Sequence, residues 1–548
     1  MNRSTLFRLA SLLTTVGLTA MHLNTAHADL TDPSGYLVGT GNSSYSVMNT
    51  SSSTPATVVA EYYNTNGSPA TSPQNLPSIP PLGRAAVALS SVPGLPSNWV
   101  GSIVLSADQD IVAAATTVYS GRNPVPDQSA PPSGNEAGAY EAFNTGSTTL
   151  FVPAIYRIPT TNGQPARQVS RYTIQNTTGS TANYTITYRS FAGVTIGTQT
   201  GTLQPYGWQT FRSWIDSEAP ATNIAAFSAV INATQPLAGV AETLTNIGVP
   251  PNRANWVGDY AMLTPNAAAT VLYSPSAFRL CPIPQQALCA QYANINDYYT
   301  TFIQYSSFQL QNTTGNVANV TADFFYQPTG LISYTLNFTI APFSSFGINL
   351  FNGGSLPLTH PIFPALGGRF AGSVRFTSDQ PLVGVGNLDF PQTTVASYGS
   401  YNLVSDADAS NTIFVPVFAR VCSGSPCDQS NPQNFSRFSA VQIMNVGTVP
   451  VTLSSIDLIT PTGSIALSLT TLPNGNPVTL APGASVGLNL LNGGTWGNTY
   501  LVNNIVPAIG TNFQGSLRVT APAGAKLKAL VEWRNGNRGM DIFNAFNR

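Results

Sequence analysis

The chain has 548 residues, of which 43% are hydrophobic and only 8% are charged. Ordinary soluble domains carry about 25% charged residues, so the surface must consist mainly of Ser, Thr, Asn, Gln and Gly. The hydrophobic content excludes a disordered chain, and the formal net charge of −1 gives no electrostatic basis for binding nucleic acid or an anionic membrane.

The first residues have the three parts of a secretory signal peptide. Arg3 and Arg8 form the basic region, Leu9 to Met21 is mostly apolar, and Ala26-His27-Ala28 is a small-x-small cleavage site. We therefore predict that residues 1–28 are removed and that the mature chain begins at Asp29.

Removal of this leader predicts a secreted, extracellular protein of the cell surface. No later segment reaches the roughly 18 apolar residues that a membrane-spanning helix needs, so we expect no membrane span in the mature chain. The mature chain keeps 19 of the 21 basic residues against 22 acidic ones, which gives a net charge of −3.

Four copies of one unit follow the leader. Each has a β-like run that ends in Asn, a turn glycine 17 or 18 residues later, a proline after the next strand, and a Gly-Ser or Phe-Ser pair. The asparagines are Asn49, Asn176, Asn312 and Asn445, the glycines Gly67, Gly193, Gly330 and Gly463, the prolines Pro81, Pro205, Pro342 and Pro482, and the serines Ser102, Ser228, Ser373 and Ser516.

A fifth feature opens each unit except the first. It reads LFVPAIYR from Leu150, VLYSPSAFR from Val271 and IFVPVFAR from Ile413, while copy 1 lacks a clear version. The asparagines are 127, 136 and 133 residues apart, a period too long for solenoid or propeller repeats of about 20–50 residues. The period suits one domain per copy.

Each copy reads as short strands between turns. Segments such as YTITYRS and VTADFFYQ alternate in polarity and are rich in β-branched and aromatic residues. We predict an all-β fold of four tandem antiparallel β-sandwich domains in series, immunoglobulin-like in architecture. Their ranges are 29–145, 146–265, 266–405 and 406–548. A small barrel per copy, or two sandwiches merging into one larger sheet, stays open.

The four cysteines fall just after the opening segments of copies 3 and 4. Cys281 and Cys289 form one local pair, and Cys422 and Cys427 form the other. We predict two disulfides, because an exported protein can hold them. A zinc site is the alternative, but neither pair has the usual CxxC spacing or a neighbouring histidine.

Groups for catalysis are scarce. His360 is the only histidine of the mature chain, and its Leu-Thr-His-Pro setting favours an ordinary loop residue. Six glutamates do not recur at matching positions, so paired-carboxylate chemistry is disfavoured. Asp406, Asp408 and Asn411 could supply oxygens to Ca²⁺, although such residues more often form a solvated linker. We predict no catalytic residue, no metal, no cofactor and no enzymatic activity.

The string GSVRFTSDQPLVGVGNLDF from Gly372, preceded by LQNTTGNVANVTADFFYQPTG from Leu310, resembles the tandem β-sandwich repeats of secreted bacterial cell-surface proteins. The resemblance covers all four copies and is strongest in copies 2 and 3. It implies a stalk, adhesion or surface-layer role and carries no catalytic motif.

Export, four β-domains and a nearly uncharged surface favour a non-enzymatic structural protein in a filament, sheath or surface layer. Such a protein would associate with itself or with other cell-surface components. A monomeric adhesin or carbohydrate-binding stalk with a glycan ligand is the alternative, and a secreted hydrolase is the weakest hypothesis. The end of the chain, Met540 to Phe546, could add to a neighbouring molecule by strand addition. It fits better as the last strand of copy 4, because Tyr140 to Phe143 has the corresponding place in copy 1.

Overall fold

The computed structural model is an all-β chain with several antiparallel sheets. It describes residues 18–23, 40–120, 136–143, 145–157, 168–213, 218–220, 224–247, 254–281, 303–327, 329–357, 359–390, 397–407, 409–423, 434–534 and 540–547. Copies 1 to 4 are the four ranges that the sequence repeats define. The strand at Leu18–Leu23 precedes the first range and is described with copy 1, because it pairs with residues 101–106.

Copies 1 and 2 consist almost entirely of strands. The elements of copy 1 are β1 (Leu18–Leu23), β2 (Thr40–Asn49), β3 (Val58–Tyr63), β4 (Gln74–Asn75), β5 (Arg84–Ala88), η1 (Leu89–Ser91), β6 (Gly101–Ala107), β7 (Ile111–Ser120) and β8 (Glu136–Glu141). Those of copy 2 are β9 (Ser147–Tyr156), β10 (Gln168–Asn176), β11 (Ala182–Ser190), β12 (Thr195–Leu203), β13 (Trp208–Arg212), β14 (Ala226–Ile247) and β15 (Ala254–Ala261).

Copies 3 and 4 repeat this order and add short helices. After η2 (Pro265–Ala267), copy 3 has β16 (Ala269–Leu280), β17 (Gln304–Asn312), β18 (Ala318–Tyr326), β19 (Leu331–Ile340), β20 (Ser345–Asn349), β21 (Gly353–Gly354), α3 (Ile362–Leu366), β22 (Arg369–Phe390) and β23 (Ser397–Asn402). Copy 4 has β24 (Thr412–Cys422), β25 (Phe435–Asn445), β26 (Val451–Thr452), β27 (Ser455–Ile459), β28 (Ile465–Leu469), β29 (Thr479–Leu480), β30 (Ser485–Asn489), η5 (Gly494–Trp496), α4 (Gly497–Tyr500), η6 (Leu501–Ile505), α5 (Val506–Ile509), β31 (Asn512–Thr520), β32 (Leu527–Arg534), β33 (Met540–Asn544) and β34 (Phe546–Asn547).

Copy 1 shows the common strand order most clearly. Its outer sheet has the order β1-β6-β3-β4, and its inner sheet has the order β5-β2-β7-β8. In copies 2 and 3 the strands that correspond to β6 and β7 are one continuous strand, β14 or β22, whose backbone hydrogen bonds join the two sheets into one. The merging of sheets therefore occurs within a copy. A long strand links the two layers in copies 2 and 3, and β24, which pairs with both β31 and β25, links them in copy 4.

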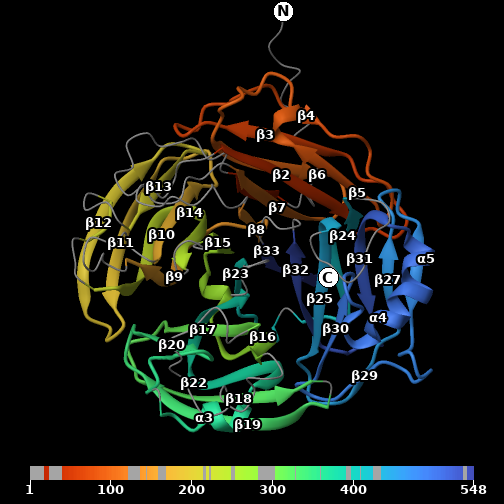
Figure 1. Cartoon of the computed structure of the whole chain (residues 1–548). Coiled ribbons are helices and arrows are strands. Elements are labelled where there is room, and N and C mark those ends of the chain that lie inside the picture. Colours follow the sequence, from red (N-terminus) through yellow and green to blue (C-terminus); the bar gives the residue numbers. More distant parts are fainter. Residues whose placement is uncertain are drawn as a thin grey trace, which may run out of the picture.

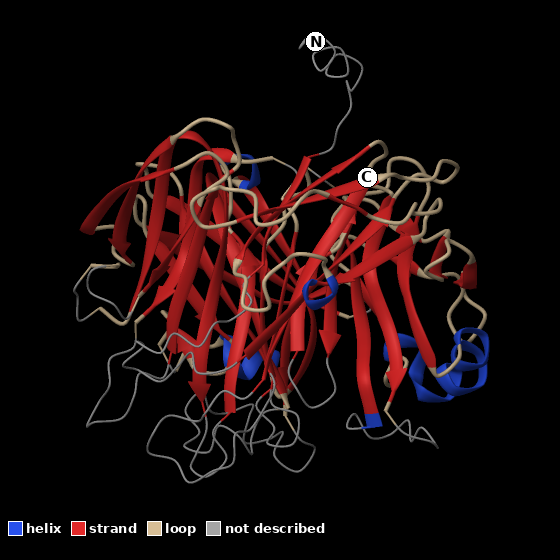
Figure 2. Cartoon of the chain, turned by 90° about the horizontal axis from the view of Figure 1, so that it is seen from above, coloured by secondary structure: helices blue, strands red, loops and turns tan. Residues whose placement is uncertain are grey.

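The four copies surround a common centre. Figure 1 shows copy 1 in orange, copy 2 in yellow, copy 3 in green and copy 4 in blue around this centre, with β8, β15, β23 and β33 innermost. Figure 2, at right angles to that view, shows that most strands run between the two faces of this ring. The ring brings copy 4 beside copy 1.

Each hydrophobic core is completed by the next copy around the ring. Four residues at equivalent positions each lie in the core cluster of the preceding copy: Val240 in that of copy 1, Val385 in that of copy 2, Leu530 in that of copy 3 and Ala114 in that of copy 4. Apolar burial contributes about 25 cal/mol per Å², so the copies stabilise one another as well as themselves. The last of these contacts joins copy 1 to copy 4 and closes the ring.

The recurring asparagine holds the turns of its own copy together. Asn312 is fully buried, and its Nδ2 donates to Asn316 O at 2.6 Å and Ala341 O at 3.2 Å. Its Oδ1 accepts from Thr314 N–H at 3.0 Å, which forms an Asx turn. The other three asparagines are also fully buried and make the same kinds of bond: Asn49, Asn176 and Asn445.

Candidate functional site

One strand near the C-terminal end of every copy, β8, β15, β23 or β33, lies at the centre of the ring. Strand β15 contacts β8 and β23, and β33 contacts β8 and β23, so the four strands form a closed set. Because side chains alternate along a strand, one set of residues points back into the sandwiches and the other points to the centre. The centre is thus built from one short segment of each copy.

The side chains that point from the central strands into the sandwiches are aromatic at one position. These residues are buried at equivalent positions, and each belongs to the core cluster of its own copy: Tyr140, Tyr260, Tyr401 and Phe543. Their neighbours along the strands are Glu141, Ala261, Asn402 and Asn544. The alternation therefore places a carboxyl and two amides from three different copies toward the middle of the ring.

Glu141 is held by groups of copies 3 and 4. Its Oε2 accepts from Asn544 N–H at 3.1 Å, and its Oε1 accepts longer bonds of 3.4 Å from the Nδ2 atoms of Asn402 and Asn544. Asn544 Nδ2 also donates to Asn402 O at 3.0 Å. Burial raises the pKa of Glu141, and the bonds from Asn544 and Asn402 lower it.

The two amides have acceptor capacity to spare. Asn402 Oδ1 and Asn544 Oδ1 are buried and accept no hydrogen bond in the described part of the chain. Carboxylate and amide oxygens suit hard cations, but both amide NH₂ groups are directed at Glu141. The arrangement therefore binds the Glu141 carboxyl group through hydrogen bonds rather than a metal cation.

Glycines give the central strands room to approach. A Cβ on Gly138 of β8 would lie 2.0 Å from Asp259 Oδ2 of β15, and one on Gly258 of β15 would lie 2.4 Å from Ser400 Oγ of β23. A Cβ on Gly399 of β23 would lie 2.5 Å from Ile542 Cγ1 of β33. Each glycine thus accommodates a side chain of the next copy.

Polar pairs lie at one register position of the inner sheets of copies 1, 2 and 3. Ser44 faces Thr116 in copy 1, with hydroxyl oxygens 2.7 Å apart, and Ser307 faces Asn387 in copy 3. In copy 2 the position holds a buried ion pair, in which Arg171 donates from Nη2 to Glu242 Oε1 at 2.6 Å. The same position carries hydroxyl, amide or charged groups in different copies.

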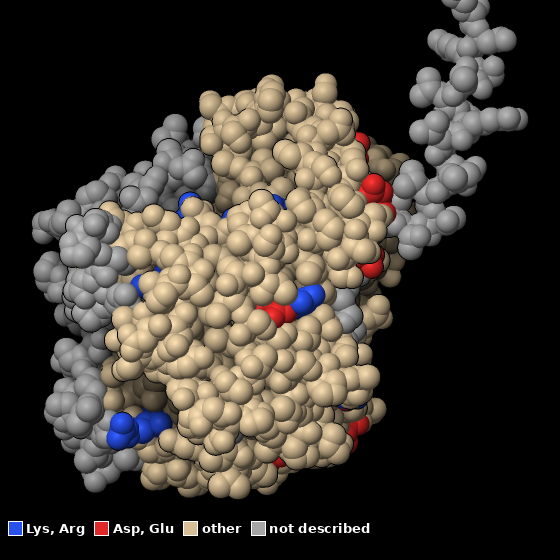
Figure 3. Space-filling view, turned by 90° about the vertical axis from the view of Figure 1, so that its right-hand side faces the viewer, with Lys and Arg blue, Asp and Glu red and all other residues tan. Residues whose placement is uncertain are grey.

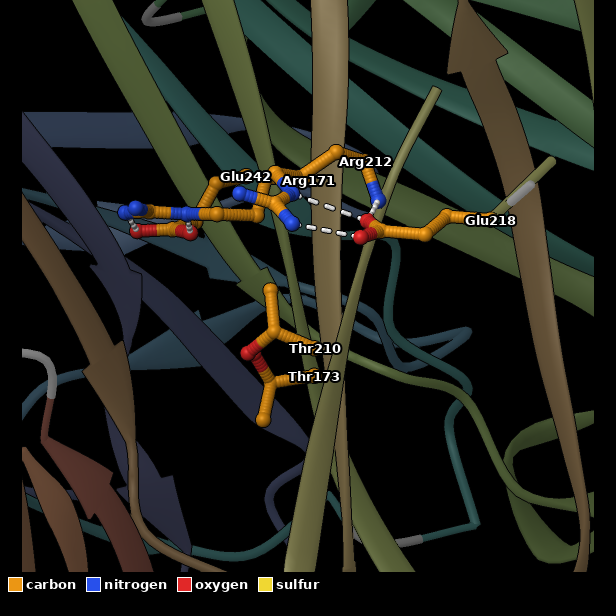
Figure 4. A network of polar contacts seen from close by, with 6 residues as sticks. All are labelled: Arg171, Thr173, Thr210, Arg212, Glu218 and Glu242. Carbon is orange, nitrogen blue, oxygen red and sulfur yellow. Dashed lines mark hydrogen bonds and ion pairs between the residues drawn. The ribbon is translucent and has the colours of Figure 1, made fainter. Parts of the chain in front are cut away.

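Figure 4 shows the copy 2 network around this ion pair. Arg171 lies against Glu242, Arg212 lies against Glu218, and the hydroxyls of Thr173 and Thr210 are 2.7 Å apart. Every charged group in this view has a counter-charge. Such pairing is what buried charges need, so each charge of the network is neutralised within copy 2.

A second buried carboxyl lies between copies 2 and 3. Burial raises the pKa of Asp389 to about 8, while a hydrogen bond from Tyr305 lowers it. Asp389 in turn raises the pKa of Tyr156 of copy 2 and of Tyr398, on each of which burial has the larger effect. The group lies among phenols, and the effect of burial outweighs that of Tyr305, so Asp389 favours the protonated form near neutral pH.

The junctions between copies use two of the recurring sequence features. The turn glycine of one copy touches the proline turn of the next: a Cβ would lie 1.8 Å from Pro205 O at Gly67, 2.4 Å from Pro342 O at Gly193, and 3.2 Å from Pro482 O at Gly330. All three glycines have positive φ, which favours glycine. The contact leaves no space for a side chain at the first two junctions and little at the third.

The same contact joins copy 4 to copy 1. A Cβ on Gly463, whose φ is +88°, would lie 2.1 Å from Pro81 O. Arg84 N–H donates to Pro461 O at 3.1 Å, as Trp208 N–H donates to Thr65 O at 3.1 Å between copies 1 and 2. The closing seam therefore has the geometry of a junction between copies that are adjacent in sequence.

Side chains beside these turns differ from junction to junction. Tyr63 stacks on Tyr206 with ring centroids 4.9 Å apart, and the Arg189 guanidinium lies 4.8 Å from the centre of the Phe343 ring. A Cβ on Gly483 would lie 2.6 Å from the Phe325 ring. At the closing seam Leu82 and Ile459 share an apolar cluster with Met48, Val112 and Phe414.

The recurring serine also joins copies at two of its four positions. Gln175 Nε2 of copy 2 donates to Ser102 Oγ of copy 1 at 2.7 Å, and Ser373 Oγ of copy 3 donates to Gly483 O of copy 4 at 2.6 Å. The asparagine, glycine and proline features are thus explained by turns and junction contacts, whereas the hydroxyls of Ser228 and Ser516 have no hydrogen-bond partner among the described residues.

The predicted site residues are spread over the molecule. Cys281 and Cys422 carry no free thiol, and Cys289 and Cys427 lie outside the described residues, so the two pairings stay predictions. His360 Nδ1 accepts from Ile362 N–H at 3.2 Å at the start of α3, and burial lowers its pKa. His360 therefore has a local structural role.

The calcium hypothesis gains no geometric support. Asp406 Oδ2 accepts from Lys526 Nζ at 2.9 Å, and Asn411 Nδ2 donates to Ala521 O at 3.2 Å. Asp408 lies outside the described residues. Across the described ranges, no group of three or more His, Cys, Asp or Glu residues is placed to hold a metal ion.

Glu141 and the central glycines were not predicted from the sequence. A signal is present in three copies as Gly-Ala-Tyr-Glu, Gly-Asp-Tyr-Ala and Gly-Ser-Tyr-Asn, which begin at Gly138, Gly258 and Gly399. This four-residue pattern is short and is changed in copy 4. The contact between the segments becomes visible only in the ring arrangement of the four copies. The segment Met540 to Phe546 belongs to the sheet of copy 4, because β33 pairs with β32 and β34 pairs with β24.

Among the described residues no helix is long and apolar enough to cross a membrane. No protein-family model matches the chain, and no curated protein matches it. The crystal structure of Thermotoga maritima 1070 aligns with a TM-score of 0.18 and 15% identity over 22% of this chain and 94% of that chain. The Anabaena sensory rhodopsin transducer aligns with a TM-score of 0.14 and 20% identity over 17% and 93%. These scores are too low to carry an argument about fold or function.

Proposed function

We propose that the chain is a secreted, non-enzymatic structural protein of the cell exterior, and that its building unit is a closed ring of four immunoglobulin-like β-sandwich domains. The observation that carries this proposal is the set of four equivalent junctions, in which Gly463 meets Pro81 as Gly67 meets Pro205. A ring closed on itself is a stiff unit, because each core is completed by a residue of the next copy.

The surface supports an assembly role. Figure 3 shows a face in which Lys, Arg, Asp and Glu form only isolated patches among uncharged residues. Several charges in the described part are engaged in pairs, such as Arg375 with Asp323 and Arg518 with Asp457. Little net charge leaves little repulsion to keep neighbouring molecules apart.

Negative-stain electron microscopy of the exported protein, residues 29–548, tests this role. We expect filaments, tubes or sheets in which a ring-shaped unit repeats. Dispersed rings at every protein and salt concentration tested would overturn the structural role. A chelator serves as a control, because no group of three or more His, Cys, Asp or Glu residues in the described ranges is placed to hold a metal ion.

A glycan-binding role is the second candidate, and one groove favours it. The outer sheet of copy 2 has an open groove of about 530 Å³, lined by Asn183, Tyr184, Thr185, Thr200, Gly201, Thr202, Asn232, Ala233 and Thr234. Hydroxyl and amide groups suit a carbohydrate, but Tyr184 is buried and offers no ring for stacking on a sugar.

A glycan array separates the two candidates. Saturable binding to one glycan class that is lost in Asn232→Ala would favour the adhesin. The matched control is Asn337→Ala, which changes an asparagine on the outer sheet of copy 3, where Thr321 Oγ1 donates to Asn337 Oδ1 at 2.8 Å. Absence of glycan binding together with ordered assemblies would favour the structural role.

A further inference from the structure

One strand position distinguishes copy 1 from the other copies. The opening strands β9, β16 and β24 pair with the long outer-sheet strand of their own copy, as in Ile155 with Phe227, Ala277 with Gly372 and Phe418 with Gly515. In copy 1 this position is held by β1, in which Leu23 pairs with Gly101 and Leu18 pairs with Ser106. Strand β1 is therefore the opening strand of copy 1.

Strand β1 lies within the leader, before the predicted cleavage site at Ala28. Export with cleavage, which is part of the proposed function, would remove it. The connection from opening strand to next strand spans residues 157–167, 281–303 and 423–434 in copies 2 to 4, and the openers themselves are 10, 12 and 11 residues long. Residues 29–39 are enough for such a connection but leave none for an opener.

Each opening strand lies between its own sheet and the inner sheet of the next copy. Besides its own sheet, each opening strand touches the inner sheet of the next copy: β9 touches β22, β16 touches β32, and β24 touches β7. Strand β1 correspondingly touches β14 of copy 2. Removal of β1 would leave a slot between β6 of copy 1 and β14 of copy 2.

We propose that cleavage of the leader turns this slot into a docking site for an extended apolar strand donated by another polypeptide, antiparallel to β6. The edge of β6 that faces β1, Gly101 to Ser106, would lose its partner strand, while the other edge stays paired with β3. An unpaired sheet edge recruits strands. The chain's own openers define the chemistry of the guest. Leu150 to Ile155 is a run of six fully or nearly fully buried residues, so the slot suits an apolar segment of similar length.

The probe is a fluorescent peptide of residues Leu150 to Arg157, with a scrambled peptide of the same composition as control. The protein is dispersed 29–548, compared with uncleaved 1–548 produced without export. We expect saturable binding of the native peptide to 29–548 and at least about tenfold weaker binding to 1–548, in which β1 fills the slot.

Hydrogen exchange provides a second readout. In 29–548 the β6 amides that face β1 should exchange at least about tenfold faster than the equivalent amides of β31, while those that face β3 stay protected, and the peptide should slow the exchange. Slow exchange at the β1-facing edge in 29–548 without peptide binding would overturn the proposal, as would mass spectrometry that finds residues 18–23 in the exported protein. Microscopy tests the structural role separately, because a protein that assembles without binding the peptide would refute only the docking site.

Discussion

The interior of each copy and the junctions between copies follow different rules. Inside a copy, Asn49, Asn176, Asn312 and Asn445 repeat one set of backbone bonds four times. At the junctions, equivalent positions hold a tyrosine stack, a cation–π pair, a ring against glycine and an aliphatic pair. The fold needs the same turn in every copy. At the junctions, the side-chain pairs differ, so each copy fits its own neighbour better than another copy, and this difference favours one order of copies around the ring.

The largest effect on stability is expected from removing the recurring asparagine inside a copy. Asn312→Ala removes a donor shared by three backbone carbonyls and the acceptor of Thr314 N–H. Buried partners would be left unsatisfied, so we expect a loss of about 4 kcal/mol in the free energy of unfolding by urea. Asn474→Ala removes a single exposed bond to Asn476 N–H and should cost less than about 0.5 kcal/mol. Similar losses in both variants would contradict the special role of the recurring asparagine.

A pH effect comes next and concerns the junction of copies 2 and 3. The pKa of Asp389 is raised to about 8 in the fold, so the folded state binds a proton that the unfolded chain has released. Stability from this group is full at low pH and falls as pH rises toward 8, by about 1.4 kcal/mol per pH unit. Asp389→Asn should reduce the difference between the unfolding free energies measured at pH 5 and at pH 8. An unchanged slope would show that Asp389 is not the responsible group.

The closing seam can be tested with two matched glycines. Gly463 and Gly475 both have positive φ, but a Cβ on Gly463 would meet Pro81 O at 2.1 Å while Gly475 has nothing within 4 Å. Both alanine variants should show about 1 kcal/mol of backbone strain, and Gly463→Ala should lose about 2 kcal/mol more through the clash. Small-angle scattering should show a larger radius of gyration for Gly463→Ala alone. Equal behaviour of the two would mean that the seam is not closed in solution.

The smallest effect concerns junction chemistry. Arg189→Gln removes the cation above Phe343 and should lower the free energy of unfolding by about 0.5–1 kcal/mol. Arg369→Gln changes an exposed arginine at the start of β22 and serves as the control, with no measurable loss expected. A double-mutant cycle of Arg189→Gln with Phe343→Leu should give a coupling energy of similar size.

The strands and the repeats could be predicted from the sequence because both are local. Alternating polarity sets a strand, and the asparagines and turn glycines recur through the same backbone turns. The meeting of Gly463 with Pro81 was not predictable, because the two residues belong to features that look independent along the chain. The Glu141 cluster was equally hidden, since its carboxyl, amides and backbone donor come from three distant segments.

The single chain also changes what the axis of the ring can hold. In a ring of four identical subunits, a glutamate at the position of Glu141 would occur four times, and four carboxylates at close range repel one another strongly. Here the equivalent residues are Ala261, Asn402 and Asn544, two of which lie within hydrogen-bonding reach of the one carboxyl. Joining four units in one polypeptide allows each unit to have a different sequence. At the axis, this difference allows one buried carboxyl to be surrounded by amides instead of three further carboxylates.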